Sequence, residues 1–235
     1  MQAILLDIEG TTTPIDFVHK VLFPFARNKV REFVRSHSLE IQPEIAQLRG
    51  EHAEDYKNGD YREIFDESYD VSVSAYLRFL IDIDRKSTPL KSIQGKIWQT
   101  GYESGELVSQ VFDDVPIAFE RWSNAGKLVA IYSSGSILAQ QLIFKYSNHG
   151  DLTRWIAQYF DTGIGHKRET DSYRNISDTL ELKSEDIVFV SDIAEELDAA
   201  RDAGIRTALI IRKGNAEFDG EPGHRRIVSF DELGV

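Results

Sequence analysis

Short runs of aliphatic and β-branched residues open the chain and recur through its second half. Such runs, bounded by polar residues, are typical of strands that are buried on both faces of a parallel sheet. The pattern predicts strands over residues 3–7, 128–134, 186–192 and 207–211, with a weaker candidate over 159–164. The segment 227–233 could add a short last strand.

Stretches with the apolar spacing of a helix lie between these runs. Residues 116–126 begin with a proline and end with a glycine, which is a common start and stop pair for a helix. Residues 136–147 have helical spacing with Ser136 as a candidate N-cap, and residues 194–204 place acids early and a glycine last. Because strands and helices alternate, we expect an α/β fold with a doubly wound parallel sheet.

The alternation fails over residues 16–110, where the pattern is helical and polar and no comparable strand run occurs. The simplest interpretation is a helical insert after the first strand. We therefore predict an α/β core made of residues 1–15 and 111–235, with residues 16–110 as the insert. The glycine-rich, polar segment 213–226 is predicted to be a loop.

Charge and composition narrow the function classes. The 235 residues include 27 Lys and Arg against 39 Asp and Glu, for a net charge of −12. This balance argues against broad binding to nucleic acid or an anionic membrane, but a local site can still bind a small anion. The absence of cysteine excludes disulfides, thiolate catalysis and cysteine-ligated zinc. With no leader-like or membrane-spanning stretch and no exposed heptad seam, we expect a cytoplasmic monomer, with a nuclear pool possible in a eukaryote.

Polar residues terminate the predicted strands. Asp7 ends the first strand, Ser133 and Ser134 end the second, Asp192 ends another, and Lys167 follows the weaker candidate. In an open α/β sheet, ligands bind outside the carboxyl ends of the strands, so we expect these side chains to converge on one site.

This set of side chains suits phosphate chemistry. Two carboxylates can hold Mg²⁺, which retains waters and accepts a substrate phosphate oxygen. Hydroxyls, a lysine and helix N-terminal N–H groups can hold the other phosphate oxygens. A carboxylate in line with phosphorus could attack it and form an aspartyl phosphate.

The segment "DIEGT" resembles the first motif of the haloacid dehalogenase superfamily, and Ser133, Lys167 and "SDIAEE" resemble its next three motifs in the right order. More narrowly, "DIEGTTTPIDFVHKVLFPFA", "YSSGSILAQQLIF", "YFDTGIGHK" and "SDIAEELDAARDAG" resemble the enolase-phosphatase family of methionine salvage. That likeness extends to "WQTGYESGEL" and covers nearly the whole chain. It implies a Rossmann-like core with a helical cap, and conversion of 2,3-diketo-5-methylthiopentyl 1-phosphate to the acireductone with loss of phosphate.

The resemblance also implies roles for single residues. Asp7 would be the nucleophile and an Mg²⁺ ligand, residue 9 would supply a second ligand through its side chain or its backbone carbonyl, and Asp192 would be the third. Lys167 would be catalytic and balance the phosphoryl charge. Glu9 stands where the superfamily usually has aspartate as acid and base, so its own role stays open between protonating the leaving oxygen and moving a proton on carbon.

The resemblance assigns substrate binding to Ser133 and Ser134, together with Lys167. Ser133 and Ser134 would bind the phosphate or the carbonyl end of the substrate. Glu195 and Glu196 could orient waters of the metal, although acids in the first turn of a helix need no function.

Several apolar and aromatic residues of the insert have two interpretations. Phe17, His19, Leu22 and Phe23 have helical spacing, which usually indicates core packing but could also line a site for a methylthio group. Trp98 and Tyr102 are interpreted as packing residues, with contact to the substrate as the alternative.

Two rival functions remain open from the sequence. The first is another haloacid dehalogenase-like phosphatase or mutase that acts on a sugar phosphate or nucleotide. The second is a non-enzymatic phospho-acceptor domain of receiver type, which also gathers acids at strand ends; the long helical insert argues against it.

Overall fold

The structure, a computed structural model, describes residues 1–215 and 223–234 and forms two compact units. One unit comprises Met1–Val18 and Val108–Val235, and the other comprises His19–Leu107. None of the helices in the described residues combines the length and the apolar character that crossing a membrane requires.

The first unit is built on a six-stranded sheet with the order β3-β2-β1-β4-β5-β6. Every neighbouring pair in the sheet is parallel, and Leu6 of β1 lies opposite Ile131 of β2 and Val190 of β4. The strands are β1 (Ala3–Leu6), β2 (Leu128–Tyr132), β3 (Ile156–Phe160), β4 (Ile187–Ser191), β5 (Arg206–Ile210) and β6 (Arg225–Ile227). This arrangement confirms the predicted parallel α/β fold.

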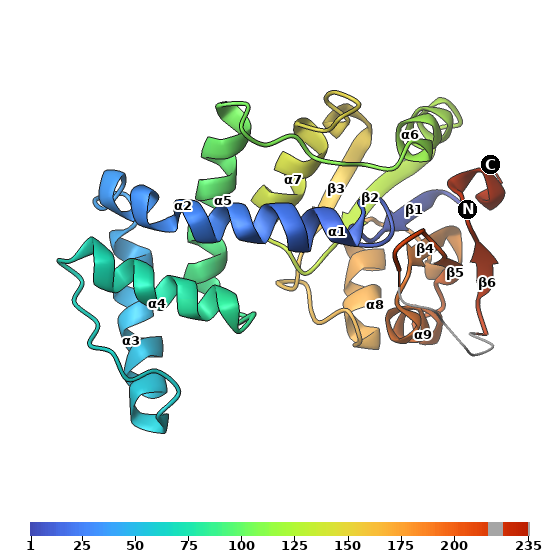
Figure 1. Ribbon diagram of the computed structural model, residues 1–235. Coiled ribbons are helices and arrows are strands. Elements are labelled where there is room, and N and C mark those ends of the chain that lie inside the picture. Colours follow the sequence, from blue (N-terminus) through green and yellow to red (C-terminus); the bar gives the residue numbers. More distant parts are fainter. Residues whose placement is uncertain (216–222, 235) are drawn as a thin grey trace. The chain divides into compact units, whose positions relative to one another are not determined.

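Four helices flank the sheet (Figure 1): α6 (Asp114–Asn124), α7 (Ile137–Lys145), α8 (Thr170–Thr179) and α9 (Ala194–Asp202). Alternate residues of the central strands, such as Leu5 and Phe189, form a core cluster with Tyr173 of α8 and Leu197 of α9. Helices α6 and α7 pack against β2 and β3 and meet through the rings of Phe119 and Phe144. Ser136 caps α7 by accepting a hydrogen bond from the Ala139 amide, as predicted.

Three predicted elements of this unit are corrected by the structure. The third strand begins and ends earlier than the predicted 159–164, and Gly163 donates its amide to the Asp161 carboxylate in a turn that follows the strand. The predicted loop 213–226 is also wrong at its end, because Arg225 and Arg226 pair with β5. Its residues 216–222 lie outside the described residues. The last strand therefore precedes most of the predicted 227–233, and a 3-10 helix follows at Phe230–Leu233.

The second unit is helical. It contains α2 (Phe23–Ser36), α3 (Gln42–Asn58), α4 (Asp70–Asp82) and α5 (Thr88–Glu103). The short helix α1 (Ile15–Phe17) belongs to the first unit, and a π-helical turn (Val18–Leu22) connects it to α2. Helix α2 packs against α4 and α5, and α3 packs against α5. The role of this helical unit as a cap stays a prediction.

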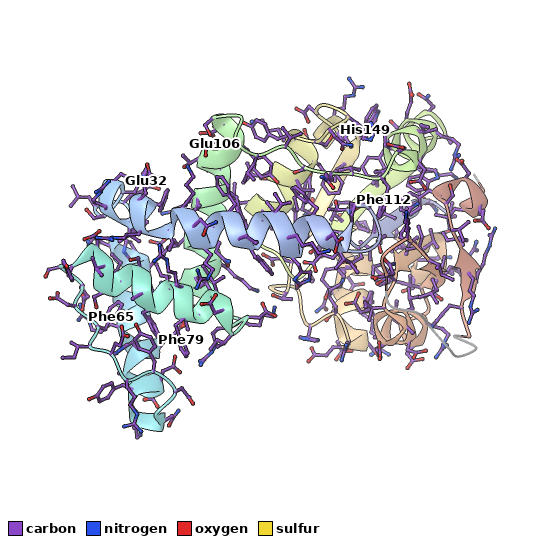
Figure 2. All side chains as sticks on the ribbon, in the orientation of Figure 1. Glu32, Phe65, Phe79, Glu106, Phe112 and His149 are labelled. Carbon is purple, nitrogen blue, oxygen red and sulfur yellow. The ribbon has the colours of Figure 1, made fainter. Side chains whose placement is uncertain are left out.

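A cluster of aromatic rings joins α3, α4 and the loop between them in this unit. The ring of His52 lies 5.3 Å from that of Phe65, and the Tyr61 ring lies 4.8 Å from that of Phe79 (Figure 2). The Trp98 indole donates to the Leu22 carbonyl at 2.9 Å and stacks on Phe23, which confirms packing as its structural role. His19 is exposed and meets Phe23 edge-on.

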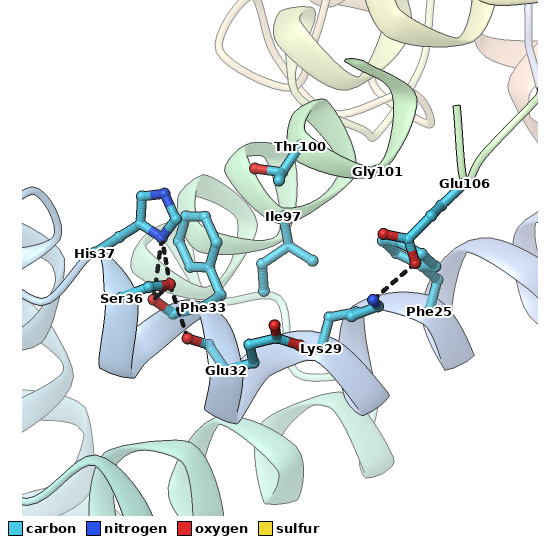
Figure 3. Close-up of a pocket in the computed structure, with 10 residues that line it drawn as sticks. All are labelled: Phe25, Lys29, Glu32, Phe33, Ser36, His37, Ile97, Thr100, Gly101 and Glu106. Atoms are coloured by element: carbon cyan, nitrogen blue, oxygen red, sulfur yellow. Dashed lines mark hydrogen bonds and ion pairs between the residues drawn. The ribbon is translucent and has the colours of Figure 1, made fainter. Parts of the chain in front are cut away.

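A cavity of about 190 Å³ lies within the helical unit (Figure 3). Phe25 and Phe33 of α2 line it together with Ile97 and Gly101 of α5. Gly101 permits a close approach of the helices, since a Cβ atom there would lie 2.5 Å from the Phe25 ring and 2.9 Å from Leu107.

We expect Gly101→Ala to lower the free energy of unfolding by about 1–3 kcal/mol, because the added methyl overpacks this contact. Gly50, inside α3, is a matched control, since a Cβ atom there would meet nothing within 4 Å. Gly50→Ala should raise the free energy of unfolding by about 0.4–1 kcal/mol. Denaturant titration of both variants tests this, and a stabilising Gly101→Ala would contradict it.

Candidate active site

The strand order reverses between β1 and β4, because successive crossovers run from β1 toward β2 and β3 and then return to β4 on the other side. A crevice outside the carboxyl ends of the strands forms at such a point and is the usual ligand site of the fold. Asp7 follows β1 and Asp192 follows β4, so the two carboxylates predicted to bind metal flank this position.

Lys167 joins Asp7 there, although 160 residues separate them in the sequence. It lies in the loop between β3 and α8, and its Nζ donates to Asp7 Oδ1 at 2.6 Å. Both residues are buried, with Asp7 4% and Lys167 6% exposed. The predicted convergence of these two residues is therefore present in the structure.

Glu196 completes an ion-paired group that the sequence only partly indicated. Its Oε2 lies 2.6 Å from Lys167 Nζ and accepts a hydrogen bond from Ser191 Oγ at 3.1 Å. Glu195, its neighbour in the first turn of α9, is exposed. The local signal was a pair of acids in that turn, but only the fold shows which one faces the lysine.

The charges of this group do not balance. Burial alone would lower the pKa of Lys167, but the charges of Asp7 and Glu196 outweigh it and raise the pKa, so Lys167 is a cation. Burial, and then the charge of Asp7, raise the pKa of Asp192 to about 7. Burial and Asp7 also raise the pKa of Glu196, against the opposing effect of Lys167. Two acids thus pair with one lysine, and Asp192 adds a third acid close enough for the charge of Asp7 to raise its pKa; this electrostatic environment favours a further cation.

The loop after β1 is a tight turn made by the glycine and threonines of "DIEGTTT". The Ile8 carbonyl accepts hydrogen bonds from the amides of Thr11, Thr12 and Thr13, at 3.2, 3.0 and 2.9 Å. Gly10 has φ +69°, and a Cβ atom there would collide with Asp192 Oδ2, so only glycine fits beside that carboxylate.

The three threonines of this loop are buried but differ in their partners. Thr12 Oγ1 donates to the Asp7 carbonyl at 3.2 Å and so holds the turn. The Thr11 and Thr13 hydroxyls have no hydrogen-bond partner within the described part of the chain. Two buried hydroxyls are therefore available to a bound group.

The structure separates the two serines at the end of β2. Ser133 is 5% exposed, whereas Ser134 is exposed. Ser133 lies two residues beyond Ile131, the partner of Leu6, so it lies at the same sheet edge as Asp7. Its Oγ accepts from the Gly135 amide at 3.3 Å. Glu9 is half-buried in the loop after β1, and its backbone forms an isolated β-bridge with Thr13.

The donor set fits a hard divalent cation. Among the described residues, no group of three or more His, Cys, Asp or Glu side chains is arranged to hold a metal ion. A metal here would thus need oxygens besides carboxylates, such as a backbone carbonyl and the waters that Mg²⁺ retains. The excess of buried acids and the elevated pKa of Asp192 are the observations that support such a fit.

Comparison with known proteins agrees with this chemistry. Residues 1–204 match the haloacid dehalogenase-like hydrolase family model. The chain is 50% identical over 229 residues to an enolase-phosphatase E1 of Leptospira borgpetersenii, covering 97% of this chain and 96% of that protein. It is 45% identical over 238 residues to an enolase-phosphatase E1 of Drosophila pseudoobscura pseudoobscura, covering 99% and 94%.

Among solved structures, the UTR4 protein of Saccharomyces cerevisiae matches with a TM-score of 0.80 and 34% identity, over 98% of both chains. The family identity thus rests on nearly the full length of the sequence as well as on the fold. The chain belongs to the enolase-phosphatase E1 family, within the haloacid dehalogenase-like hydrolases.

Proposed function

We propose that this chain is an Mg²⁺-dependent enolase-phosphatase acting on 2,3-diketo-5-methylthiopentyl 1-phosphate. The products are 1,2-dihydroxy-3-keto-5-methylthiopentene and inorganic phosphate. The observation that carries the proposal is the buried contact of 2.6 Å between Lys167 and Asp7 at the reversal point of the sheet. It supplies a nucleophile and a phosphate-neutralising cation where ligands of this fold bind.

In the proposed phosphoryl transfer, a carboxylate oxygen of Asp7 attacks phosphorus and the bond from phosphorus to the substrate oxygen breaks. That oxygen leaves with the electron pair and takes a proton, for which Glu9 or a bound water is the candidate donor. Water then attacks phosphorus, which releases inorganic phosphate and restores Asp7. Lys167, held between Asp7 and Glu196, keeps a positive charge beside the reacting group throughout.

Enolisation requires removal of a proton from the carbon that bears the phosphate oxygen, next to a carbonyl. Glu9, Ser133 or a bound water could accept this proton, and Ser133 and Ser134 are proposed to hold the phosphate or the carbonyl end. The buried hydroxyls of Thr11 and Thr13 support binding of polar substrate atoms at this loop. In this scheme Asp7 attacks phosphorus and is not the base for enolisation.

Mg²⁺ is proposed to be held by Asp7 and Asp192 with an oxygen of residue 9. Bound there, Mg²⁺ would offset the clustered negative charge and polarise substrate oxygens.

We expect chelation with EDTA to lower turnover at least about 100-fold, because Asp7 and Asp192 repel each other and the substrate phosphate without a cation. Excess Mg²⁺ should restore turnover. Phosphate release measured before and after chelation checks this, with circular dichroism to show that the fold is kept. Full turnover in metal-free buffer would refute the metal requirement.

A further inference from the structure

Two carbonyls of the loop after β1 are held by residues that follow β5. The Gly10 carbonyl accepts a hydrogen bond from Asn215 Nδ2 at 2.9 Å. The Thr11 carbonyl accepts one from Arg212 Nε at 3.2 Å. The loop between Asp7 and Thr13 is thus anchored from outside at two consecutive residues, in addition to its own turn.

Arg212 is itself rigidly held. Its guanidinium pairs with Asp114, with Nη1 3.0 Å from Oδ2 and Nη2 2.9 Å from Oδ1. It lies over two rings, 4.5 Å from the centroid of Phe112 (labelled in Figure 2) and 4.9 Å from that of Phe230. Only 8% of its side chain is exposed. A planar guanidinium that is ion-paired and packed against two rings is a fixed donor, so the Thr11 carbonyl has a fixed position.

Asn215 acts next to the proposed metal site. A Cβ atom built on Gly10 would collide with Asp192 Oδ2 and would also lie 3.1 Å from Asn215 Oδ1. The Asp192 carboxylate and the Asn215 amide therefore both lie close to Gly10, and the amide also donates to the Gly10 carbonyl. A shift of the Gly10 backbone would alter the spacing between Asp7, three residues earlier, and Asp192.

We propose that Arg212 and Asn215 are positioning residues, which hold the loop of residues 7–13 so that Asp7 and Asp192 keep a productive spacing. This inference rests on the proposed function for its catalytic consequence, but the anchoring of the loop is a property of the chain itself. Neither residue is proposed to touch the substrate or to exchange a proton.

A purely structural role and a positioning role can be separated. Arg212→Lys keeps a positive charge for Asp114, but an ammonium lacks the planar fork that bonds Asp114 and the Thr11 carbonyl at once. Asn215→Ala removes a single donor from a half-buried position. Arg121→Ala is a matched control, because Arg121 pairs with Asp231 at 2.7 Å and donates to the Phe230 carbonyl at 2.7 Å. It thus contacts the C-terminal segment through residues other than the loop of residues 7–13.

The experiment compares the three variants with the original chain by three measurements. Hydrogen exchange of a peptide covering residues 8–13 measures how often the loop opens. Titration calorimetry measures the Mg²⁺ dissociation constant, and steady-state kinetics with the diketo phosphate measures kcat and KM. For Arg212→Lys and Asn215→Ala, we expect faster loop exchange and a kcat about 10- to 100-fold lower, with KM changed less than kcat. The Mg²⁺ dissociation constant should rise about 10-fold. Arg121→Ala should match the original chain in all three.

Unchanged loop exchange in Arg212→Lys and Asn215→Ala would overturn the inference, as would faster exchange with an unchanged kcat. Equal losses in Arg121→Ala would also overturn it, because they would indicate general destabilisation. If the original chain fails to turn over the diketo phosphate, the proposed function fails separately. In that case loop exchange and Mg²⁺ affinity still test whether Arg212 and Asn215 anchor the loop. The anchoring is rejected if both variants give the same values as the original chain.

Discussion

Asp7→Asn will stop phosphate release while sparing proton exchange at carbon. Asparagine keeps an oxygen atom near the position of the carboxylate but is not a nucleophile toward phosphorus, so phosphate release should fall at least about 10⁴-fold. Exchange needs only a base and stabilisation of the enolate, which Glu9, Ser133 or water could provide. Deuterium uptake from heavy water into the phosphorylated substrate, followed by NMR, measures the second reaction separately from the first.

Two controls make this result interpretable. The amide lacks the charge of Asp7, so Mg²⁺ titration must first establish that the variant binds the metal at the concentration used. Asp16→Asn, an exposed position in α1, controls for a change of net charge near the loop. If the metal-loaded Asp7→Asn neither exchanges nor releases phosphate, both steps require Asp7 and the proposed division of labour is wrong.

Lys167→Met should lower phosphate release at least about 10³-fold, because it removes the fixed cation that faces the phosphoryl charge. The same change leaves Asp7, Asp192 and Glu196 without their buried lysine. Removing one partner of a buried pair costs about 3–5 kcal/mol of folding free energy, so a lower melting temperature is expected. Saturating Mg²⁺ should recover part of this stability by binding to the acids that have lost their lysine partner.

Lys127→Met is the matched control for this prediction. Lys127 also belongs to the sheet unit, but its Nζ donates to the Met1 carbonyl at 2.7 Å, away from the strand ends that carry the acids. Phosphate release at saturating substrate should stay within about threefold of the original rate in this control, since surface changes have small effects. A Lys167→Met variant that is folded and fully active would show that the assigned role of Lys167 is wrong.

The central residues of the site could be predicted from the sequence because they follow strands that can be recognised from their local composition. Buried parallel strands are apolar and end abruptly, and the polar residues that follow them share one sheet edge. Asp7 and Lys167 could therefore be expected together despite a separation of 160 residues. Strand β3 was harder to locate, since it is an edge strand with exposed positions at Ala157 and Gln158, and these break the apolar run.

Other features depend on tertiary contacts that leave little trace in composition. Glu196 resembles an ordinary acid in the first turn of a helix until the fold places Lys167 beside it. Arg212 and Asn215 lie in a polar, glycine-containing segment that resembles a solvated loop, yet one is nearly buried and both bond to the loop after β1. Long-range pairing of this kind follows from topology and cannot be derived from local pattern.

The most direct measurement follows both products of one reaction. The chain is incubated with Mg²⁺ and 2,3-diketo-5-methylthiopentyl 1-phosphate, and inorganic phosphate and the acireductone are recorded together, with a panel of sugar phosphates and nucleotides in parallel. The account predicts equal amounts of the two products and much slower release from the panel. Phosphate release without the acireductone, or a preference for sugar phosphates or nucleotides, would contradict it.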